Sequence, residues 1–95
     1  MKHTEEVLTI RAEIDEIDAQ ILVLLARRFD RVRRMGELKT SAGSPLRDTA
    51  REKQILLRLT EINLKLQKDV PQECLEEIFQ SIMDWGLKIQ QKNGY

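Results

Sequence analysis

Apolar residues recur at steps of three and four along most of the chain, a spacing that predicts amphipathic helices. Two stretches rich in turn-forming residues interrupt this spacing, at 41–45 and at 68–71. In the second, Asp69 is a candidate helix cap and Pro71 suits the first turn of the following helix. No run of β-branched residues alternates with polar ones, so no strand is expected. The pattern predicts an all-α fold with three helices, over about residues 5–40, 46–66 and 70–92.

The first predicted helix carries an apolar seam with heptad spacing. A helix of this extent would be about 54 Å long, whereas a compact monomer of this chain length would be about 32 Å across. We therefore expect an obligate homodimer in which the long first helices intertwine. The seam consists of Val7, Ile10, Ile14, Ile17, Ile21, Leu24, Met35 and Leu38, with Arg28 and Arg31 in the same register, and Leu22, Leu25, Phe29 and Val32 form a second stripe beside it.

Each of the other two predicted helices has one apolar face. Gly86 and Gln90 continue the face of the third helix. A glutamine on an apolar face needs hydrogen-bond partners, and a glycine inside a helix costs about 1 kcal/mol relative to alanine unless the space is needed. The apolar faces consist of Ile55, Leu56, Leu59, Ile62 and Leu66 in the second helix and of Leu75, Ile78, Phe79, Ile82 and Met83 in the third.

The composition narrows the class of protein. A length of 95 residues predicts a single domain over 1–95, and its 16 Lys and Arg balance 16 Asp and Glu. A zero net charge argues against a protein that chiefly binds nucleic acid or an acidic membrane surface. No apolar stretch approaches the roughly 20 residues that span a bilayer, the opening residues lack the apolar segment of a secretory signal, and the single cysteine cannot form an internal disulfide. We expect a cytoplasmic protein with neither a nucleic-acid nor a membrane partner.

Charged residues occupy seam positions where apolar ones are expected. An unpaired buried guanidinium at Arg28 would be costly, so an internal carboxylate or an anionic ligand pairs with it, or the seam opens to water there. Arg31 is expected to face solvent or to have a structural role, because the seam is already interrupted at Arg28. Lys39 lies about 16 Å further along nearly the same face, so both side chains could reach one small metabolite. Arg11 lies about 25 Å away in the other direction, so only a second chain could bring it to Arg28.

The start of the second predicted helix places Asp48, Arg51, Glu52 and Ile55 on one face. From the spacing alone, we favour a capped helix start over a binding site. In this interpretation Asp48 lies at the positive end of the helix dipole and the neighbouring charges form local ion pairs.

Five short motifs cover nearly the whole chain in a fixed order. They are Ile10-Arg11-x-x-Ile14-x-x-Ile17-Asp18, Leu24-Leu25-Ala26-x-Arg28, Gly36-x-x-Lys39, Arg47-Asp48-x-x-Arg51-Glu52, and Phe79-Gln80 with Gln90-Gln91. Each is weak alone, but their order and spacing together are specific. In these motifs the chain resembles the small all-helical chorismate mutases of the AroQ class. The charged and polar residues noted above coincide with those that this family uses in its active site.

The resemblance implies an intertwined dimer with two equivalent pockets. Members of the family convert chorismate to prephenate, in aromatic amino acid biosynthesis, by a [3,3] sigmatropic rearrangement. Their substrate is a dianion with two carboxylates, an ether oxygen and a ring hydroxyl. The reaction needs positioning and charge stabilisation rather than a nucleophile, a metal or a redox cofactor. The implied cofactor requirement is therefore none.

The resemblance also implies roles for the cationic and amide side chains. Arg28 and the Arg11 of a partner chain should hold the substrate carboxylates, because a guanidinium binds a carboxylate through two parallel hydrogen bonds. Lys39 and Gln90 should donate hydrogen bonds to the ether oxygen, which gains negative charge in the transition state.

The remaining implied site residues lie in the second and third predicted helices. Glu52, together with the region of Asp48, should receive the ring hydroxyl, and Arg51 should stabilise the pocket electrostatically. Gly86 stands where relatives often carry a serine that contacts a carboxylate. Its lost hydrogen bond, worth about 0.5–1.5 kcal/mol, should reduce affinity without abolishing activity. Trp85 beside it is expected to pack or to contact a dimer edge.

Two alternatives stay open. The first is a related enzyme on the same fold, an isochorismate-pyruvate lyase or an aminodeoxychorismate mutase. The lyases resemble this chain around 27–30 but generally lack the Arg51-Glu52 pair, which favours the mutase. The second is a non-catalytic helical dimer that binds RNA or protein through the arginines between 27 and 34. The balancing acidic residues and the scarcity of aromatics for base stacking argue against RNA.

Overall fold

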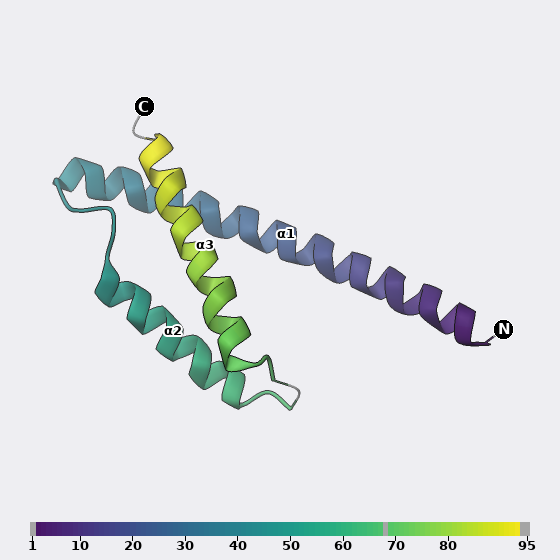
Figure 1. Cartoon of the computed structure of the whole chain (residues 1–95). Helices are drawn as coiled ribbons and strands as arrows, with labels where there is room; N and C mark the ends of the chain where they lie inside the picture. The colour runs from purple at the N-terminus through teal and green to yellow at the C-terminus, as the bar shows by residue number, and fades with distance from the viewer. Residues whose placement is uncertain (1, 68, 94–95) are drawn as a thin grey trace. The chain divides into compact units, whose positions relative to one another are not determined.

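The computed structural model describes residues 2–67 and 69–93, and these residues form three α-helices and no strand (Figure 1). The helices are α1 (Lys2–Ala42), α2 (Thr49–Leu64) and α3 (Gln72–Asn93). The predicted all-α class and the long first helix are confirmed. Among the described residues, no helix is both long enough and apolar enough to cross a membrane.

The chain divides into two units, one ending at residue 31 and the other starting at residue 32. The first unit is a single helical segment, the greater part of α1. Within it the predicted seam is uncovered, with Ile10 47% exposed, Ile17 52% exposed and Leu24 57% exposed. A lone helix has no second element against which to bury a wide apolar arc.

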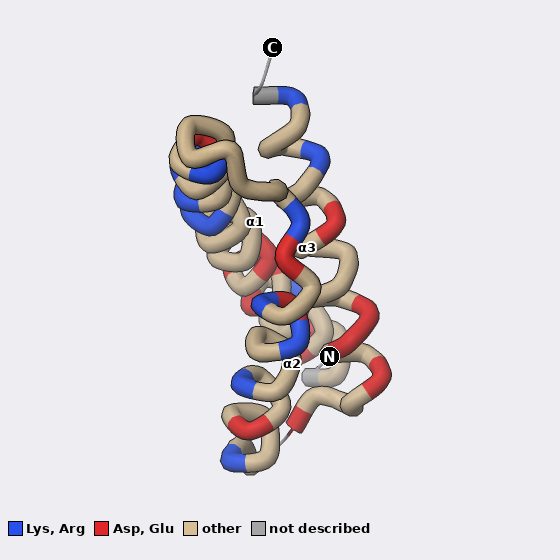
Figure 2. The backbone as a smooth tube through the Cα atoms, turned by 90° about the vertical axis from the view of Figure 1, so that its left-hand side faces the viewer, with Lys and Arg blue, Asp and Glu red and all other residues tan. Residues whose placement is uncertain are grey.

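The second unit comprises the end of α1 together with α2 and α3. The latter two helices run in opposite directions side by side (Figures 1 and 2). Leu75 and Met83 of α3 form the buried centre. Ile62, Leu66 and Ile78, predicted to lie on buried faces, are 44%, 50% and 51% exposed in the single chain, because the helices of this unit do not cover every apolar position.

Helix α1 ends at Ala42, two residues later than predicted, and Gly43 follows it as the terminating residue. Gly43 adopts a φ of 70°, in the left-handed region that glycine tolerates without strain. Its N–H donates to the Thr40 carbonyl at 3.1 Å, and the Ser44 N–H donates to the Lys39 carbonyl at 2.9 Å. These two bonds form a Schellman motif, which satisfies carbonyls at the helix end.

Helix α2 begins at Thr49, later than the predicted residue 46, because Asp48 is its N-cap. The Asp48 backbone is extended, with φ −131° and ψ 91°, and its side chain accepts a hydrogen bond from the Arg51 N–H at 3.0 Å. The predicted capped helix start is therefore confirmed.

Asn63, near the end of α2, holds the segment that leads into α3. It is 6% exposed, and its amide makes a reciprocal pair of hydrogen bonds with the backbone of Val70, at 2.6 and 2.9 Å. Helix α3 starts at Gln72, and the Pro71 carbonyl accepts from the Leu75 N–H at 3.0 Å. The prediction that Asp69 caps this helix is wrong, and Pro71 precedes the helix rather than lying in its first turn, because the backbone of Val70 is bonded to Asn63 and α3 begins only at Gln72.

Charges along α3 follow the helix dipole. All of its acidic residues, Glu73 to Asp84, precede its two lysines, Lys88 and Lys92 (Figure 2). Glu73 occupies the first turn and Lys92 the last, an arrangement that stabilises both ends of a helix.

Candidate active site

In the second unit, the end of α1, the start of α2 and the last half of α3 enclose a hollow of about 100 Å³. Five of the predicted site residues line it, and they come from all three helices and the α2 cap. The lining residues are Lys39, Leu46, Arg47, Asp48, Arg51, Glu52, Ile55, Met83, Leu87 and Gln90. We call this hollow the α2 hollow.

Lys39 enters the α2 hollow from the last turns of α1. Its side chain is half-buried, and Nζ donates a hydrogen bond to the Leu46 carbonyl at 3.1 Å. This bond directs the ammonium group toward the start of α2. A lysine ammonium has three N–H donors, so two stay available for a ligand.

Gln90 enters the same hollow from α3 and lies against α1. Its Nε2 donates to the Val32 carbonyl at 3.0 Å, which leaves the second N–H of the amide for a ligand. Gly36 makes this approach possible, because a Cβ at that position would lie 2.8 Å from Cγ of Gln90. The sequence analysis named Gly36 only as part of a motif and gave it no role. A glycine in the middle of a predicted helix was the signal that could have marked it as a position of close approach.

Asp48 combines two roles that the sequence interpretation treated as alternatives. It caps α2 through one carboxylate oxygen and also lines the α2 hollow. Arg51, one turn into the helix, is exposed at the rim of the hollow.

The Glu52 carboxylate is held by side chains from outside α2. Its Oε1 accepts from Nε2 of Gln80 at 3.3 Å, and its Oε2 lies 3.6 Å from Nε of Arg47. Asp84 accepts from Nε2 of Gln80 and from the Arg47 guanidinium, both at 3.0 Å. The sequence analysis missed this arrangement. It named Arg47 and Gln80 only as members of motifs, without a role, and most of the contacts join residues far apart in the chain.

Gly86 and Trp85 lie on different sides of α3. Gly86 is buried, and a Cβ there would lie 3.4 Å from a methyl carbon of Val32, an ordinary packing distance. It is not among the residues lining the α2 hollow. Trp85 is 54% exposed, with Nζ of Lys88 4.3 Å from its ring centre.

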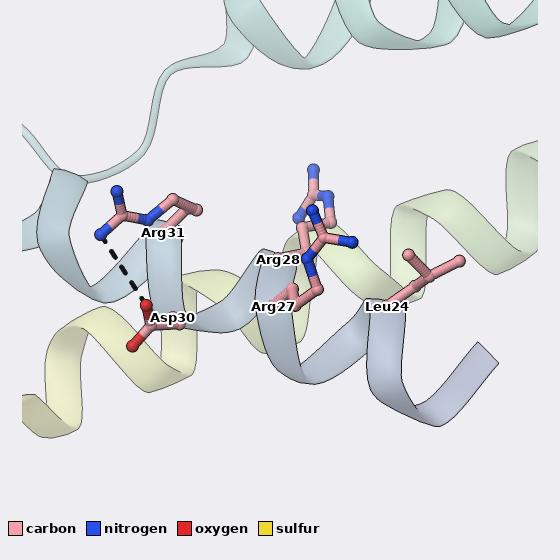
Figure 3. A pocket seen from close by; sticks show the side chains of 5 residues that line it. All are labelled: Leu24, Arg27, Arg28, Asp30 and Arg31. Atoms are coloured by element: carbon pink, nitrogen blue, oxygen red, sulfur yellow. Dashed lines mark ion pairs between the residues drawn. The ribbon is translucent and has the colours of Figure 1, made fainter. Parts of the chain in front are cut away.

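Arg28 lies in the first unit, in a surface hollow of about 370 Å³ on α1 (Figure 3). The hollow carries three guanidinium groups and one carboxylate, a strongly cationic surface. Arg31 is exposed, as predicted, and is paired with Asp30 at 3.8 Å. Arg11 is exposed on the same unit. The lining residues are Leu24, Arg27, Arg28, Asp30 and Arg31.

The α2 hollow suits an anionic ligand that also carries a hydroxyl group. Three cationic side chains and one amide supply N–H donors, whereas Asp48 and Glu52 supply acceptors. Apolar side chains of Ile55, Met83 and Leu87 form the remaining wall. Donors converging beside an apolar wall can bind and orient a small polar ring, and can stabilise negative charge that develops on it.

Comparison with known proteins extends these observations. The family described as "Chorismate mutase type II" matches residues 10–91. The "Chorismate mutase" of Methanocaldococcus jannaschii is 33% identical over 88 residues, which cover 93% of this chain and 87% of that protein. The solved structure of a form II chorismate mutase from Thermus thermophilus has a TM-score of 0.82 at 28% identity, and the match covers 90% of this chain and 94% of that one.

A longer relative is the "Bifunctional chorismate mutase/prephenate dehydratase" of Aquifex aeolicus. It is 36% identical over 89 residues, which cover 93% of this chain and 25% of that protein. The chain therefore spans about a quarter of the length of this bifunctional relative.

Proposed function

The chain belongs to the chorismate mutase type II family, and from this premise we propose that it catalyses the [3,3] sigmatropic rearrangement of chorismate to prephenate. One observation carries the proposal: Lys39, Gln90 and Glu52, two donors and an acceptor from three different helices, line a single hollow. Such an arrangement matches a substrate with an ether oxygen and a ring hydroxyl. We also propose that the 95 residues act as one domain, because the family match spans both units of the chain.

The α2 hollow would stabilise the transition state at the ether oxygen. As the C–O bond of the substrate stretches, negative charge grows on this oxygen, and the free N–H groups of Lys39 and Gln90 would donate to it. Both side chains are already oriented by bonds to backbone carbonyls. Donors oriented before the reaction need not reorganise during it, which is the main source of electrostatic catalysis.

The hydroxyl end of the substrate would meet the acceptors of α2. Glu52, with Asp48 beside it, would accept a hydrogen bond from the ring hydroxyl, and Arg51 at the rim would attract the dianion. The substrate ring would then lie with its enolpyruvyl arm folded over it, the geometry that the rearrangement requires.

Arg28 and the Arg11 of a second copy of the chain would hold the two carboxylates. The cationic hollow around Arg28 supports this assignment, since a guanidinium binds a carboxylate in a planar, bidentate fashion. Gly86 would leave one carboxylate contact to backbone or water, with reduced affinity as the consequence.

We propose an intertwined homodimer as the active form. Two observations support it. The seam of α1 leaves a series of large apolar side chains about half exposed, Ile10, Ile14, Ile17, Ile21 and Leu24 among them, and apolar surface of this extent is typical of protein interfaces. In addition, the α2 hollow, at about 100 Å³, is smaller than the roughly 300–1,000 Å³ of ordinary ligand sites, which favours completion by further walls.

Purified protein incubated separately with chorismate and with isochorismate tests the reaction. Conversion of chorismate to prephenate without release of pyruvate supports the proposal. Pyruvate release from isochorismate without prephenate formation would instead identify a lyase. Salt-dependent RNA binding without turnover of either compound would identify a non-catalytic helical module.

A cytoplasmic location completes the proposal. It is supported by the single cysteine, which leaves the fold independent of internal disulfides. Fractionation of cells that express the natural protein, followed by immunodetection, tests this location.

A further inference from the structure

We infer that Gln80 is a positioning residue for Glu52 and thereby makes the site selective for a substrate that bears a ring hydroxyl. The inference rests on the proposed function, because it concerns how the proposed hydroxyl acceptor is oriented. Gln80 does not line the α2 hollow and acts through Glu52.

The amide of Gln80 bridges two carboxylates. Its Nε2 lies 3.3 Å from Oε1 of Glu52 on α2 and 3.0 Å from Oδ1 of Asp84, one turn further along α3. A primary amide has two N–H donors, so both are used here. The orientation of the amide follows from its partners, because two carboxylates accept hydrogen bonds only from the nitrogen.

Arg47 closes the arrangement into a ring. Its guanidinium donates to Oδ1 of Asp84 at 3.0 Å, while its Nε lies 3.6 Å from Oε2 of Glu52. One cation and one amide thus separate two like charges that would otherwise repel each other. We call Arg47, Gln80 and Asp84 the Glu52 brace.

The brace fixes the position of the Glu52 carboxylate, which is less exposed to solvent than the charged side chains that hold it. The side chain of Glu52 is 20% exposed, whereas those of Arg47 and Asp84 are 45% and 47% exposed. Exposed ion pairs contribute little to stability, so the main consequence is geometric. Each oxygen of Glu52 has one protein partner, and each keeps acceptor capacity for a ligand.

A fixed acceptor discriminates between hydroxyl donors and groups that cannot donate. A site built to hydrogen-bond a substrate hydroxyl rejects analogues without it, because its polar groups are then left unpaired. If the carboxylate is free to turn away, this penalty disappears. The preference of the enzyme for a substrate with the free hydroxyl therefore measures whether the brace holds Glu52 in place.

The test compares chorismate with its ring methyl ether, which cannot donate from the same oxygen. In Gln80→Leu, which preserves side-chain bulk and removes the amide, we expect kcat/KM for chorismate to fall about tenfold, mostly through KM. For the methyl ether, we expect little change. The ratio of the two kcat/KM values, measured for wild type and variant, is the readout.

The chain contains a matched control. Gln72 on α3 donates through Nε2 to Thr60 on α2 and to Glu76, at 2.8 and 3.2 Å. Like Gln80, it makes one bond to α2 and one within α3, here to a hydroxyl and a carboxylate, and it lies away from the α2 hollow. Gln72→Leu should leave the substrate ratio unchanged.

A second variant keeps the inference testable if Gln80→Leu does not fold. The carboxyl introduced by Gln80→Glu can donate only when protonated, so its kcat/KM for chorismate, relative to wild type, should rise as the pH falls from about 7 to about 5. Equal losses for both substrates in Gln80→Leu, or a pH-independent ratio to wild type in Gln80→Glu, overturn the inference alone. A wild-type protein that leaves chorismate unchanged overturns the proposed function, and the inference with it.

Discussion

At the scale of single residues, the two main donors of the α2 hollow are oriented by hydrogen bonds within the protein and still have N–H groups available for a ligand. Lys39 and Gln90 each use one N–H on a backbone carbonyl and retain at least one more. Residues that touch the reacting atoms can therefore be distinguished by mutation from those that only shape the hollow.

Lys39→Ala removes the cationic donor. We expect turnover of chorismate to fall at least about 100-fold with the oligomeric state unchanged, because the lost bond strengthens as the ether oxygen gains charge. Steady-state kinetics checks this. Lys88→Ala, which removes the same charge from the exposed side of α3, should stay near the wild-type rate. A Lys39→Ala variant of normal rate contradicts the assigned role.

Gln90→Glu should shift activity toward acid pH. Only the protonated carboxyl can donate to the ether oxygen, and a glutamate in water has a pKa of about 4.3, so activity should increase as pH is lowered from about 7. Measuring kcat against pH for this variant and for wild type provides the check. Gln91→Glu, on the exposed neighbouring position, is the matched control, and a flat profile for Gln90→Glu argues against Gln90 as donor.

Gly36→Ala should impair the hollow while leaving the helix intact. The added Cβ would lie 2.8 Å from Cγ of Gln90, so the amide must move, and we expect kcat to fall about tenfold. Alanine favours a helix by about 1 kcal/mol over glycine, so stability should fall little or rise. In a Gln90→Ala background the same change should cost much less activity; a loss of equal size there would contradict the steric explanation.

At the scale of the helices, the second unit depends on how α2 is joined to α3. Its buried centre is small, with Leu75 and Met83 as the buried apolar residues. Polar contacts at the junction therefore have a large share in holding the two helices at their observed spacing, and Asn63 makes the most buried of them.

Asn63→Ala should lower the free energy of unfolding by about 2–3 kcal/mol, because it removes both bonds to Val70 and leaves backbone groups without partners. Thermal unfolding at fixed protein concentration measures the effect. Gln67→Ala, at an exposed position nearby, should change stability by less than about 0.5 kcal/mol. Equal stability of the two variants would show that the Asn63 bonds do not hold the junction.

At the scale of the whole molecule, the exposed seam of α1 leads to a prediction of mass. We expect sedimentation equilibrium to give twice the chain mass of 11.1 kDa. Ile14→Glu, which places a charge in the seam, should dissociate the dimer and abolish activity, because an unpaired charge is costly to bury. Asp15→Asn, beside the seam, should do neither. A stable, active single chain would contradict the dimer proposal.

Periodicity predicted the helical class, the long α1 and the cap at Asp48, because these features depend on interactions between residues at most a few positions apart. Helix ends were less accurate: α1 continues to Ala42 and terminates at Gly43, which accepts a positive φ. Helix positions alone had singled out Lys39 and Gln90 as candidates, but had favoured a capped helix start for Asp48, Arg51 and Glu52; the resemblance supplied the roles of all five in one site.

Long-range contacts were beyond the reach of the sequence. The close approach of Gly36 to Gln90 and the contact of Glu52 with Gln80 join residues from separate helices, and the Asn63 junction joins α2 to the segment before α3. The apolar pattern indicates which face of a helix is buried. It does not determine which neighbouring helix covers that face, or how the two helices are rotated relative to each other. Those quantities depend on how all the side chains pack at once, so the partners of Glu52 became visible only after the helices had been assembled.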